Sequence, residues 1–436
     1  MMKIHNRFIF FLICIGFIIT SCAHIPEITE AKKGIVVIHG DSNTTESEGP
    51  SDSRFHTLLN PGTELGFVRR PAAADYTYFP KFRDIDSFPE YNPDSRDTWQ
   101  VDVRSSDLRE LDLSESVEDL FYASFDTVTE WPEDLPEPFD PERIMRLGRN
   151  PGLGLRDLHE QGIDGSGVGI AIIDQALLVE HREYADNLRL YEEIHYHKNS
   201  RASMHGPAVA SIAVGKNAGA APGADLYYIA EWHAVRVNNE WKFDIAPIAA
   251  SIDRIVEINR RLPEDRKIRV ISISLRINSR MKNHSLVMEA AARAEEENIH
   301  TIYVGSGDTF GAGRYPLADP DDPASYGPGM FWRHTMYEYI NDKIVIPMDS
   351  RCTAGPSGED GYAFYRNGGM SWVIPYAAGL YALGCQVNPE MDPEQFWSTL
   401  KETAIITESK ENPMDRDFGL IVNPKGFIET VRTNGK

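Results

Sequence analysis

The sequence has few cysteines, a deficit of basic residues and only one long apolar run. Four cysteines among 436 residues are too few for a scaffold held together by disulfides. Lys and Arg total 44 against 66 Asp and Glu, which gives a net charge of −22. This balance argues against a nucleic-acid partner, because phosphate backbones are captured by cationic surfaces. It also argues against electrostatic adhesion to anionic lipid.

The one long apolar run lies at the start of the chain and is typical of an export signal. Lys3 and Arg7 precede an apolar run over 8–19, which is too short to span a bilayer. The segment that follows, Ile19-Thr20-Ser21-Cys22, resembles the lipobox of bacterial lipoproteins. The resemblance implies a signal peptide over 1–21, cleavage before Cys22 and lipidation of that residue. An ordinary secretory signal is the alternative. We therefore expect an exported protein, lipid-anchored to the cell membrane or envelope.

Two cysteines, Cys352 and Cys385, remain after the signal and the lipidation site. Outside the cytosol they are able to form a disulfide. Sequence spacing does not show whether the two residues lie close together. We favour two buried free thiols.

The mature chain divides into an acidic N-terminal region, 22–145, and a main domain, 146–436. Within the first region, residues 101–145 hold 14 acidic and 3 basic residues. This region is interpreted as a removable pro-segment, an extension packed on the main domain or a partner surface, with the packed extension as the default.

The main domain alternates apolar strands with amphipathic helices, which predicts an α/β fold with a mostly parallel sheet covered by helices on both faces. Strands are expected at 168–173, 226–230, 269–275 and 299–304, and helices at 247–261 and 285–297. Active sites in such sheets lie at the carboxyl ends of the strands.

Three residues stand where catalytic side chains are often found. Asp174 ends the first predicted strand, His205 opens a helix of small residues, and Ser371 precedes a helix whose first turn suits Pro375. A helix N-terminus favours a developing negative charge. Taken singly, each residue has a structural reading as a cap, a turn residue or a buried histidine. Taken together, their order Asp, His, Ser is that of subtilisin.

On these motifs the chain resembles the subtilisin-like (S8) serine peptidases over about 151–403. The resemblance also includes the segments 165–168, 181–184, 219–224 and 270–275. It implies a three-layer subtilisin-like fold and a protein or peptide substrate. It further implies that Ser371 is the nucleophile, that His205 is the general base and that Asp174 orients the imidazole. No cofactor is expected. Some family members bind structural calcium, but no loop here demands it, and His195 and His197 are interpreted as surface residues rather than metal ligands.

The sequence departs from the family pattern at two places in the expected site. The family's side-chain amide donor for the oxyanion is missing after the strand 299–304, where Ser306 and Asp308 are the candidates in its place. A protonated Asp308 could donate a hydrogen bond, so we expect any activity to strengthen at acidic pH. Ser274, Leu275 and Arg276 occupy the expected substrate-binding edge, where the family usually has glycines after the leucine.

Two functions follow from this pattern. One is a serine endopeptidase that works through an acyl-enzyme. The other is a catalytically weak or inactive pseudopeptidase that serves as a binding or scaffold module. Retention of Asp174, His205 and Ser371 favours the enzyme, and the missing oxyanion amide is the argument for the alternative.

Overall fold

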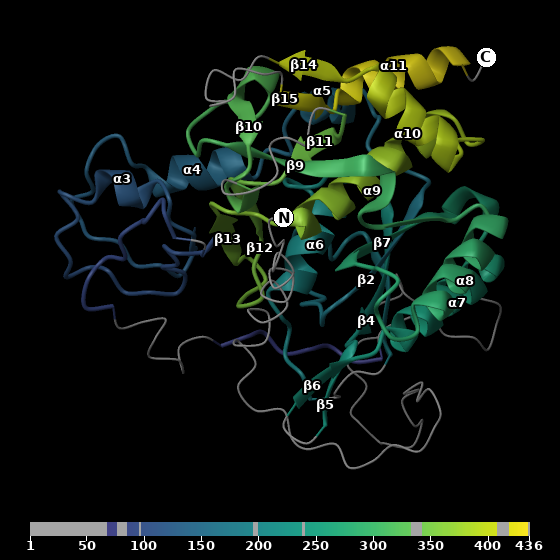
Figure 1. The fold of residues 1–436 in the computed structure, drawn as a ribbon, viewed down its shortest axis with the longest axis horizontal. Coiled ribbons are helices and arrows are strands. Elements are labelled where there is room, and N and C mark those ends of the chain that lie inside the picture. The colour runs from purple at the N-terminus through teal and green to yellow at the C-terminus, as the bar shows by residue number, and fades with distance from the viewer. Residues whose placement is uncertain are drawn as a thin grey trace, which may run out of the picture.

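The computed structural model describes residues 68–75, 85–95, 97–194, 199–237, 240–332, 342–407 and 418–434. At its centre is a five-stranded sheet of order β3-β4-β2-β7-β8, in which every pairing is parallel (Figure 1). The strands are β2 (Gly169–Asp174), β3 (Leu188–Ile194), β4 (Asp225–Glu231), β7 (Ile268–Arg276) and β8 (His300–Val304). Four of these five strands were expected from the sequence to within one or two residues, and β3 was not.

Helices cover both faces of this sheet, and the alternation of side chains along β2 shows why. Ile170 and Ile172 pack on one side with α6 (His205–Val214) and α9 (Met370–Val387). Ala171 and Ile173 pack on the other side with α7 (Ala246–Arg261) and α8 (His284–Glu296). The predicted α/β fold with a parallel sheet between two helical layers is therefore confirmed.

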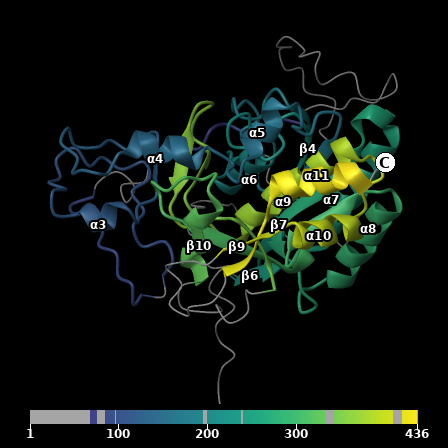
Figure 2. The same ribbon diagram turned by 90° about the horizontal axis from the view of Figure 1, so that it is seen from above.

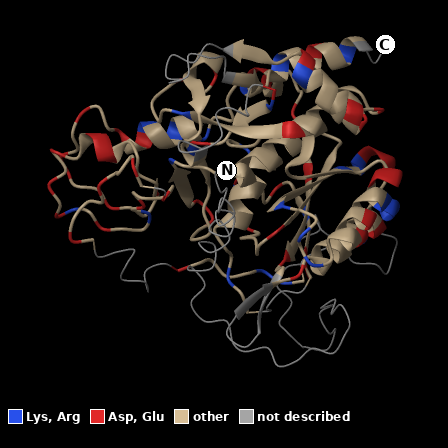
Figure 3. Ribbon diagram, in the orientation of Figure 1, with Lys and Arg blue, Asp and Glu red and all other residues tan. Residues whose placement is uncertain are grey.

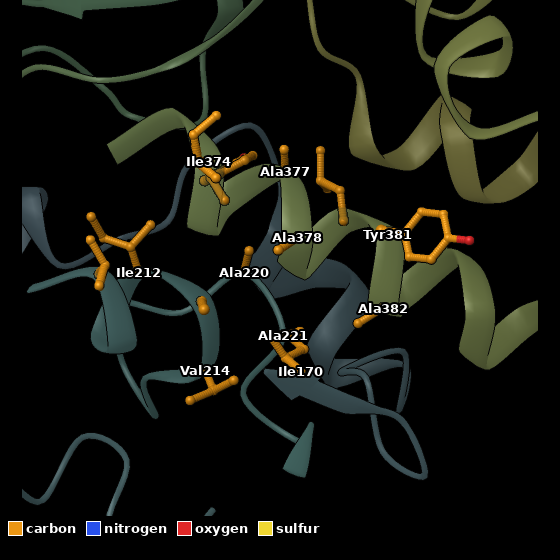
Figure 4. Packing of buried hydrophobic residues seen from close by; sticks show 14 of the residues in the cluster. Ile170, Ile212, Val214, Ala220, Ala221, Ile374, Ala377, Ala378, Tyr381 and Ala382 are labelled. Atoms are coloured by element: carbon orange, nitrogen blue, oxygen red, sulfur yellow. The ribbon is translucent and has the colours of Figure 1, made fainter. Parts of the chain in front are cut away.

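The helices α6 and α9 approach each other closely because small residues line their contact. Figure 4 shows Ala220 and Ala221, which follow α6, directly below Ala377 and Ala378 of α9. A Cβ built on Gly379 would lie 2.5 Å from the Ala220 Cβ, so only glycine fits at this point. This contact fixes the two helices that carry His205 and Ser371 relative to each other.

A second sheet flanks the first and has the order β10-β9-β11-β15-β14. Its strands are β9 (Thr309–Arg314), β10 (Tyr326–Pro328), β11 (Ile344–Pro347), β14 (Ile405–Thr407) and β15 (Phe418–Ile421). The remaining helices of the main domain are α5 (Leu155–Glu160), α10 (Pro393–Glu402) and α11 (Pro424–Asn434), with short 3-10 turns η3 (Glu264–Arg266), η4 (Ser306–Asp308), η5 (Pro323–Ser325) and η6 (Met330–Trp332). A hairpin of β5 (Ala234–Val237) and β6 (Glu240–Phe243) follows β4.

The acidic region forms a lobe with its own small core on one side of the main domain (Figures 1 and 2). It contains α3 (Val117–Leu120), β1 (Phe125–Asp126) and α4 (Pro141–Gly148). The strand β1 pairs antiparallel with β13 (Tyr362–Tyr365), which pairs with β12 (Arg351–Ala354). Buried aromatic side chains from both parts share this core: Phe121, Phe125, Phe139 and Phe364.

The predicted boundary between residues 145 and 146 falls inside α4. A Cβ on Gly148 at the end of this helix would lie 2.8 Å from the Cys352 backbone nitrogen, so the helix is packed tightly on β12. Asp and Glu positions, red in Figure 3, are spread along much of the chain of this lobe. Whether residues 22–145 are removed from the mature protein stays a prediction.

The two remaining cysteines are confirmed as buried free thiols. Burial raises the pKa of both, that of Cys385 to about 12. Both thiols are therefore protonated at neutral pH and unreactive. None of the helices in the described ranges is long and apolar enough to cross a bilayer. Residues 1–22 and the His195-Tyr-His197 segment lie outside the described residues.

Candidate active site

Asp174 is the last residue of β2, at the carboxyl edge of the parallel sheet. Its Oδ1 lies 2.6 Å from Nδ1 of His205 and also accepts a hydrogen bond of 2.8 Å from the Gln175 N–H. The side chains are 6% and 11% exposed for Asp174 and His205, respectively. Since a carboxylate only accepts, the Nδ1 of His205 carries the proton of this bond and Nε2 is left available as a base.

The position of His205 depends on a close approach between α6 and the loop after Asp174. His205 is the first residue of α6, and the helix continues with Gly206. A Cβ on Gly206 would lie 2.6 Å from both the Gln175 carbonyl oxygen and the Tyr228 hydroxyl. The Tyr228 hydroxyl donates to that same Gln175 carbonyl at 2.5 Å. The small residue after the histidine therefore lets the imidazole reach the carboxylate of Asp174.

Ser371 is the second residue of α9 and is linked to the end of β7 by two reciprocal hydrogen bonds. Its Oγ donates to the Ser274 carbonyl at 3.2 Å, and the Ser274 hydroxyl donates to the Ser371 carbonyl at 2.9 Å. Pro375 was expected in the first turn, but α9 begins at Met370, so the proline lies in the second. Because Pro375 has no N–H, the Ser371 carbonyl lacks the donor that residue i+4 normally supplies. Ser274 supplies a donor instead.

The His205 ring and Ser371 are connected through Trp372. The indole of Trp372, the residue after Ser371, packs on the His205 ring with centroids 5.5 Å apart. Within the described residues, Ser371 Oγ is bonded to the Ser274 carbonyl and makes no hydrogen bond to His205. Catalytic hydrogen bonds of this type often tighten only in the substrate complex, so this geometry is compatible with a serine–histidine pair.

A buried carboxylate that the sequence analysis missed holds the loop before Ser371. Asp349 is 1% exposed and accepts two backbone hydrogen bonds, from Gly368 N–H at 2.8 Å and from Met330 N–H at 2.6 Å. A Cβ on Gly368 would overlap the Met348 backbone oxygen. No local motif marks Asp349, because its partners are 19 residues away on either side.

The two candidates for an oxyanion side chain are engaged elsewhere. The Asp308 carboxylate is paired with Lys343 at 2.7 Å and with Lys401 at 3.5 Å. The hydrogen bond from Lys343 is the main cause that lowers the pKa of Asp308, which keeps this carboxyl ionised. Ser306 Oγ accepts the Tyr303 N–H at 3.0 Å. These contacts argue against the protonated-donor role expected for Asp308.

The location of Asp308 also argues against a role for its side chain as an oxyanion donor. Its neighbour Gly307 lies against the Trp397 ring of α10, and α10 packs on the distal part of α9, where Phe396 meets Tyr381. Tyr381 is ten residues after Ser371, or about 15 Å along the helix. The N–H groups in the first turn of α9 are the alternative candidates, because a helix leaves its first N–H groups without intrahelical acceptors. Among them, the Trp372 N–H donates to the Gly369 carbonyl at 2.9 Å.

The expected substrate-binding edge consists of the last three residues of β7. Ser274 contacts Ser371, as described above. Leu275 is half-buried against the α7/α8 layer, so its side chain points away from Ser371. Arg276 is exposed and pairs with Val304 of β8.

A second acid–imidazole pair lies at the carboxyl end of β4, next to the pair described above. Glu231 ends β4, its side chain is 3% exposed, and His233 Nδ1 lies 3.3 Å from its Oε2. Burial lowers the pKa of His233, but Glu231 and, to a smaller extent, Asp174 raise it more. The sequence analysis missed this pair, although both residues directly follow a predicted strand of the sheet that carries Asp174.

Comparisons with known proteins match one family model and several solved structures. Residues 165–327 match the model of the subtilase family. This stretch includes Asp174 and His205 and ends before Ser371. Solved structures with a similar fold include a protease from Pseudoalteromonas arctica, with 16% identity, a TM-score of 0.47 and coverage of 67% of this chain and 98% of that one.

Two further similar structures are maturation enzymes. The prenylagaramide maturation protease PagA is 17% identical with a TM-score of 0.43, and the match covers 64% of this chain and 98% of that one. The PatG macrocyclase in complex with peptide is 15% identical with a TM-score of 0.44, covering 65% and 96%. Over residues 165–327, the chain therefore carries a domain of the subtilase family of peptidases.

Proposed function

We propose that this protein is a serine endopeptidase that cleaves peptide bonds with Ser371, His205 and Asp174. The observation that supports it most is the 2.6 Å hydrogen bond between His205 Nδ1 and the buried Asp174 carboxylate, next to the helix start that carries Ser371. A carboxylate in this position fixes the imidazole tautomer and stabilises the imidazolium that forms during catalysis.

The proposed reaction is an acyl transfer in two halves. Ser371 Oγ attacks the carbonyl carbon of the peptide while His205 Nε2 accepts the hydroxyl proton. His205 then protonates the leaving amine nitrogen, which leaves the acyl group on Ser371. Water, deprotonated by the same imidazole, releases the acid and regenerates the serine. The backbone N–H groups at the start of α9 stabilise the negative oxygen of each tetrahedral intermediate.

We further propose that the enzyme is exported and attached to a membrane through a lipid on Cys22. This proposal is supported by the basic, apolar and small-residue pattern of 1–22. More than one acyl chain is needed for stable attachment to a bilayer. Cys22→Ala is expected to move the protein from the membrane fraction to the soluble fraction after export. Equal partitioning of both proteins would refute the anchor.

The pseudopeptidase is the second candidate, and two observations favour it. Ser371 Oγ donates to Ser274 rather than to His205, and Asp308 is an ion-pair partner of two lysines. A protein of this kind retains the fold but does not activate the serine.

A fluorophosphonate probe distinguishes the two candidates, because it reacts covalently with an activated serine. Residues 23–436 are treated at pH 5 and pH 7.5, and intact mass reports the adduct. Labelling that is lost in Ser371→Ala and retained in Ser306→Ala supports the peptidase. Absence of an adduct from folded protein at both pH values, both before and after residues 23–145 are trimmed, refutes it. A defined peptide mixture is then digested with the wild type and with Ser371→Ala. The bonds that only the wild type cleaves are those cleaved through Ser371.

A further inference from the structure

The acidic extension contacts the loop that leads into helix α9 and the proposed nucleophile, Ser371. The Trp99 indole N–H donates to the Asn367 carbonyl at 3.2 Å, and the Asn367 side-chain amide donates to the Thr98 carbonyl. Asn367 is four residues before Ser371. Residues 98 and 99 of the extension are thus bonded to this loop in both directions.

A second connection runs from the extension to the imidazole. The Arg104 guanidinium donates to the Tyr365 hydroxyl at 3.2 Å and lies 5.1 Å from the centre of the Tyr365 ring. The Tyr365 ring meets the Trp372 indole at 5.4 Å, and Trp372 packs on His205 at 5.5 Å. Tyr365 and Trp372 are 4% and 5% exposed, so both are held on every side.

Within the extension, the segment that contains Arg104 is held in place by further hydrogen bonds. Asp102 binds the Arg104 guanidinium through both carboxylate oxygens, at 2.8 and 2.7 Å. The Ser124 N–H next to this segment donates to the Val101 carbonyl at 2.8 Å. Separation of the lobe from β13 would expose the aromatic core that the two parts share. Such a lobe is an unsuitable segment for removal during maturation.

We propose that Arg104 and Trp99 are positioning residues of the catalytic centre, so that residues 97–145 belong to the working enzyme. Arg104 orients His205 through Tyr365 and Trp372. Trp99 holds the loop before Ser371 through its hydrogen bond to Asn367. This inference rests on the proposed function only in the labelling experiment below, and the NMR experiment tests it without catalysis.

The chain offers a matched control for Arg104. Asp107-Leu108-Arg109 repeats the arrangement Asp102-Val103-Arg104, with the guanidinium bound to the carboxylate two residues earlier at 2.9 and 2.7 Å. Arg109 bonds to Glu130 instead of a ring near the site. Arg104→Gln and Arg109→Gln therefore remove equivalent local ion pairs, and only the first removes a contact to Tyr365.

The first measurement is the rate of fluorophosphonate labelling. Arg104→Gln is expected to slow it about tenfold, because a displacement of about 1 Å at a reacting group costs about a hundredfold and the expected shift is smaller. Arg109→Gln is expected to label at the wild-type rate. Tyr365→Phe keeps the ring and loses the hydroxyl, so the double variant with Arg104→Gln should be no slower than Arg104→Gln alone. Peptide mapping of the labelled protein should recover residues 97–145.

The second measurement does not require activity. The His205 ring proton is observed by NMR in protein with labelled histidine and is assigned with His205→Asn. Arg104→Gln should shift this resonance, because the Trp372 ring next to it moves, and Arg109→Gln should not. A shift without any labelling of Ser371 would support the positioning role and refute the peptidase. Wild-type labelling rates with an unmoved resonance in Arg104→Gln, or labelling confined to molecules that lack 97–145, would overturn the proposal.

Discussion

Substitution of Asp349 should change both the stability of the fold and the reactivity of the proposed nucleophile, Ser371. Asp349→Ala removes the acceptor of two buried backbone N–H groups, those of Gly368 and Met330. Each buried donor left without a partner costs about 1–3 kcal/mol, so the free energy of unfolding should fall by about 2–6 kcal/mol. Domain stabilities are about 5–15 kcal/mol, so Asp349→Asn, which keeps one acceptor, is the milder substitute.

The same substitution should also slow fluorophosphonate labelling, since Gly368 is three residues before Ser371. We expect at least about a tenfold loss of rate, because displacement of a reacting group by 1 Å costs about a hundredfold. Urea unfolding measures the stability, and labelling is measured at a urea concentration where both proteins are folded.

Asn259→Ala is the control for this effect. Asn259 is 4% exposed, and its side-chain oxygen accepts the Ile268 N–H at 2.8 Å. Its loss should also destabilise the protein, by about 1–3 kcal/mol. Ile268 lies at the other end of β7 from Ser274, about 20 Å away, so labelling should not change. Wild-type labelling by Asp349→Ala, or an equal loss in Asn259→Ala, would refute the positioning argument.

Three further results are expected. Asp308→Asn should leave the labelling rate at pH 5 and pH 7.5 within about twofold of wild type and lower the free energy of unfolding by at most about 1 kcal/mol. The exposed ion pair with Lys343 lowers the pKa of Asp308, so its contribution is lost only as the pH falls through that lowered pKa. A rise in labelling at acidic pH that disappears in this variant would contradict this expectation. Burial lowers the pKa of His300 to about 4, so stability should fall as pH drops from about 6.5 to about 4, by up to about 3 kcal/mol, and this part of the acid loss should be absent from urea unfolding of His300→Phe. Gly206→Ala should slow labelling more than tenfold, because its Cβ would press on the Gln175 carbonyl next to Asp174.

The sequence was sufficient to predict four of the five strands of the central sheet, because those strands are continuous apolar runs and the helices between them have clear periodicity. The predicted helix at 247–261 differs from α7 by one residue at its start. The place of Pro375 was predicted wrongly because local rules put proline in the first turn. Its tolerance in the second turn depends on the Ser274 hydroxyl, a contact across 97 residues of sequence.

Two features of the site that the sequence did not predict depend on long-range contacts. Asp308 follows a strand of the sheet, as a catalytic donor would, and only the folded chain brings Lys343 and Lys401 to its carboxylate. Asp349 lies in no motif and was not proposed. The acidic composition of 101–145 was compatible with a pro-segment, a partner surface and a packed extension alike, because charge describes the exposed side of the lobe and not its aromatic core.

The contacts of the extension change how the missing oxyanion amide is interpreted. An enzyme that has lost a side-chain donor depends more on the exact placement of its nucleophile and base, since preorganised geometry is then its main source of rate. Here the loop before Ser371 is hydrogen-bonded to Asp349 through the Gly368 N–H and to Trp99 through the Asn367 carbonyl. A protein that only retained the fold would have no need for a bond between a separate lobe and this particular loop. The arrangement therefore favours a site kept in working geometry, with the extension as one of the parts that hold it there.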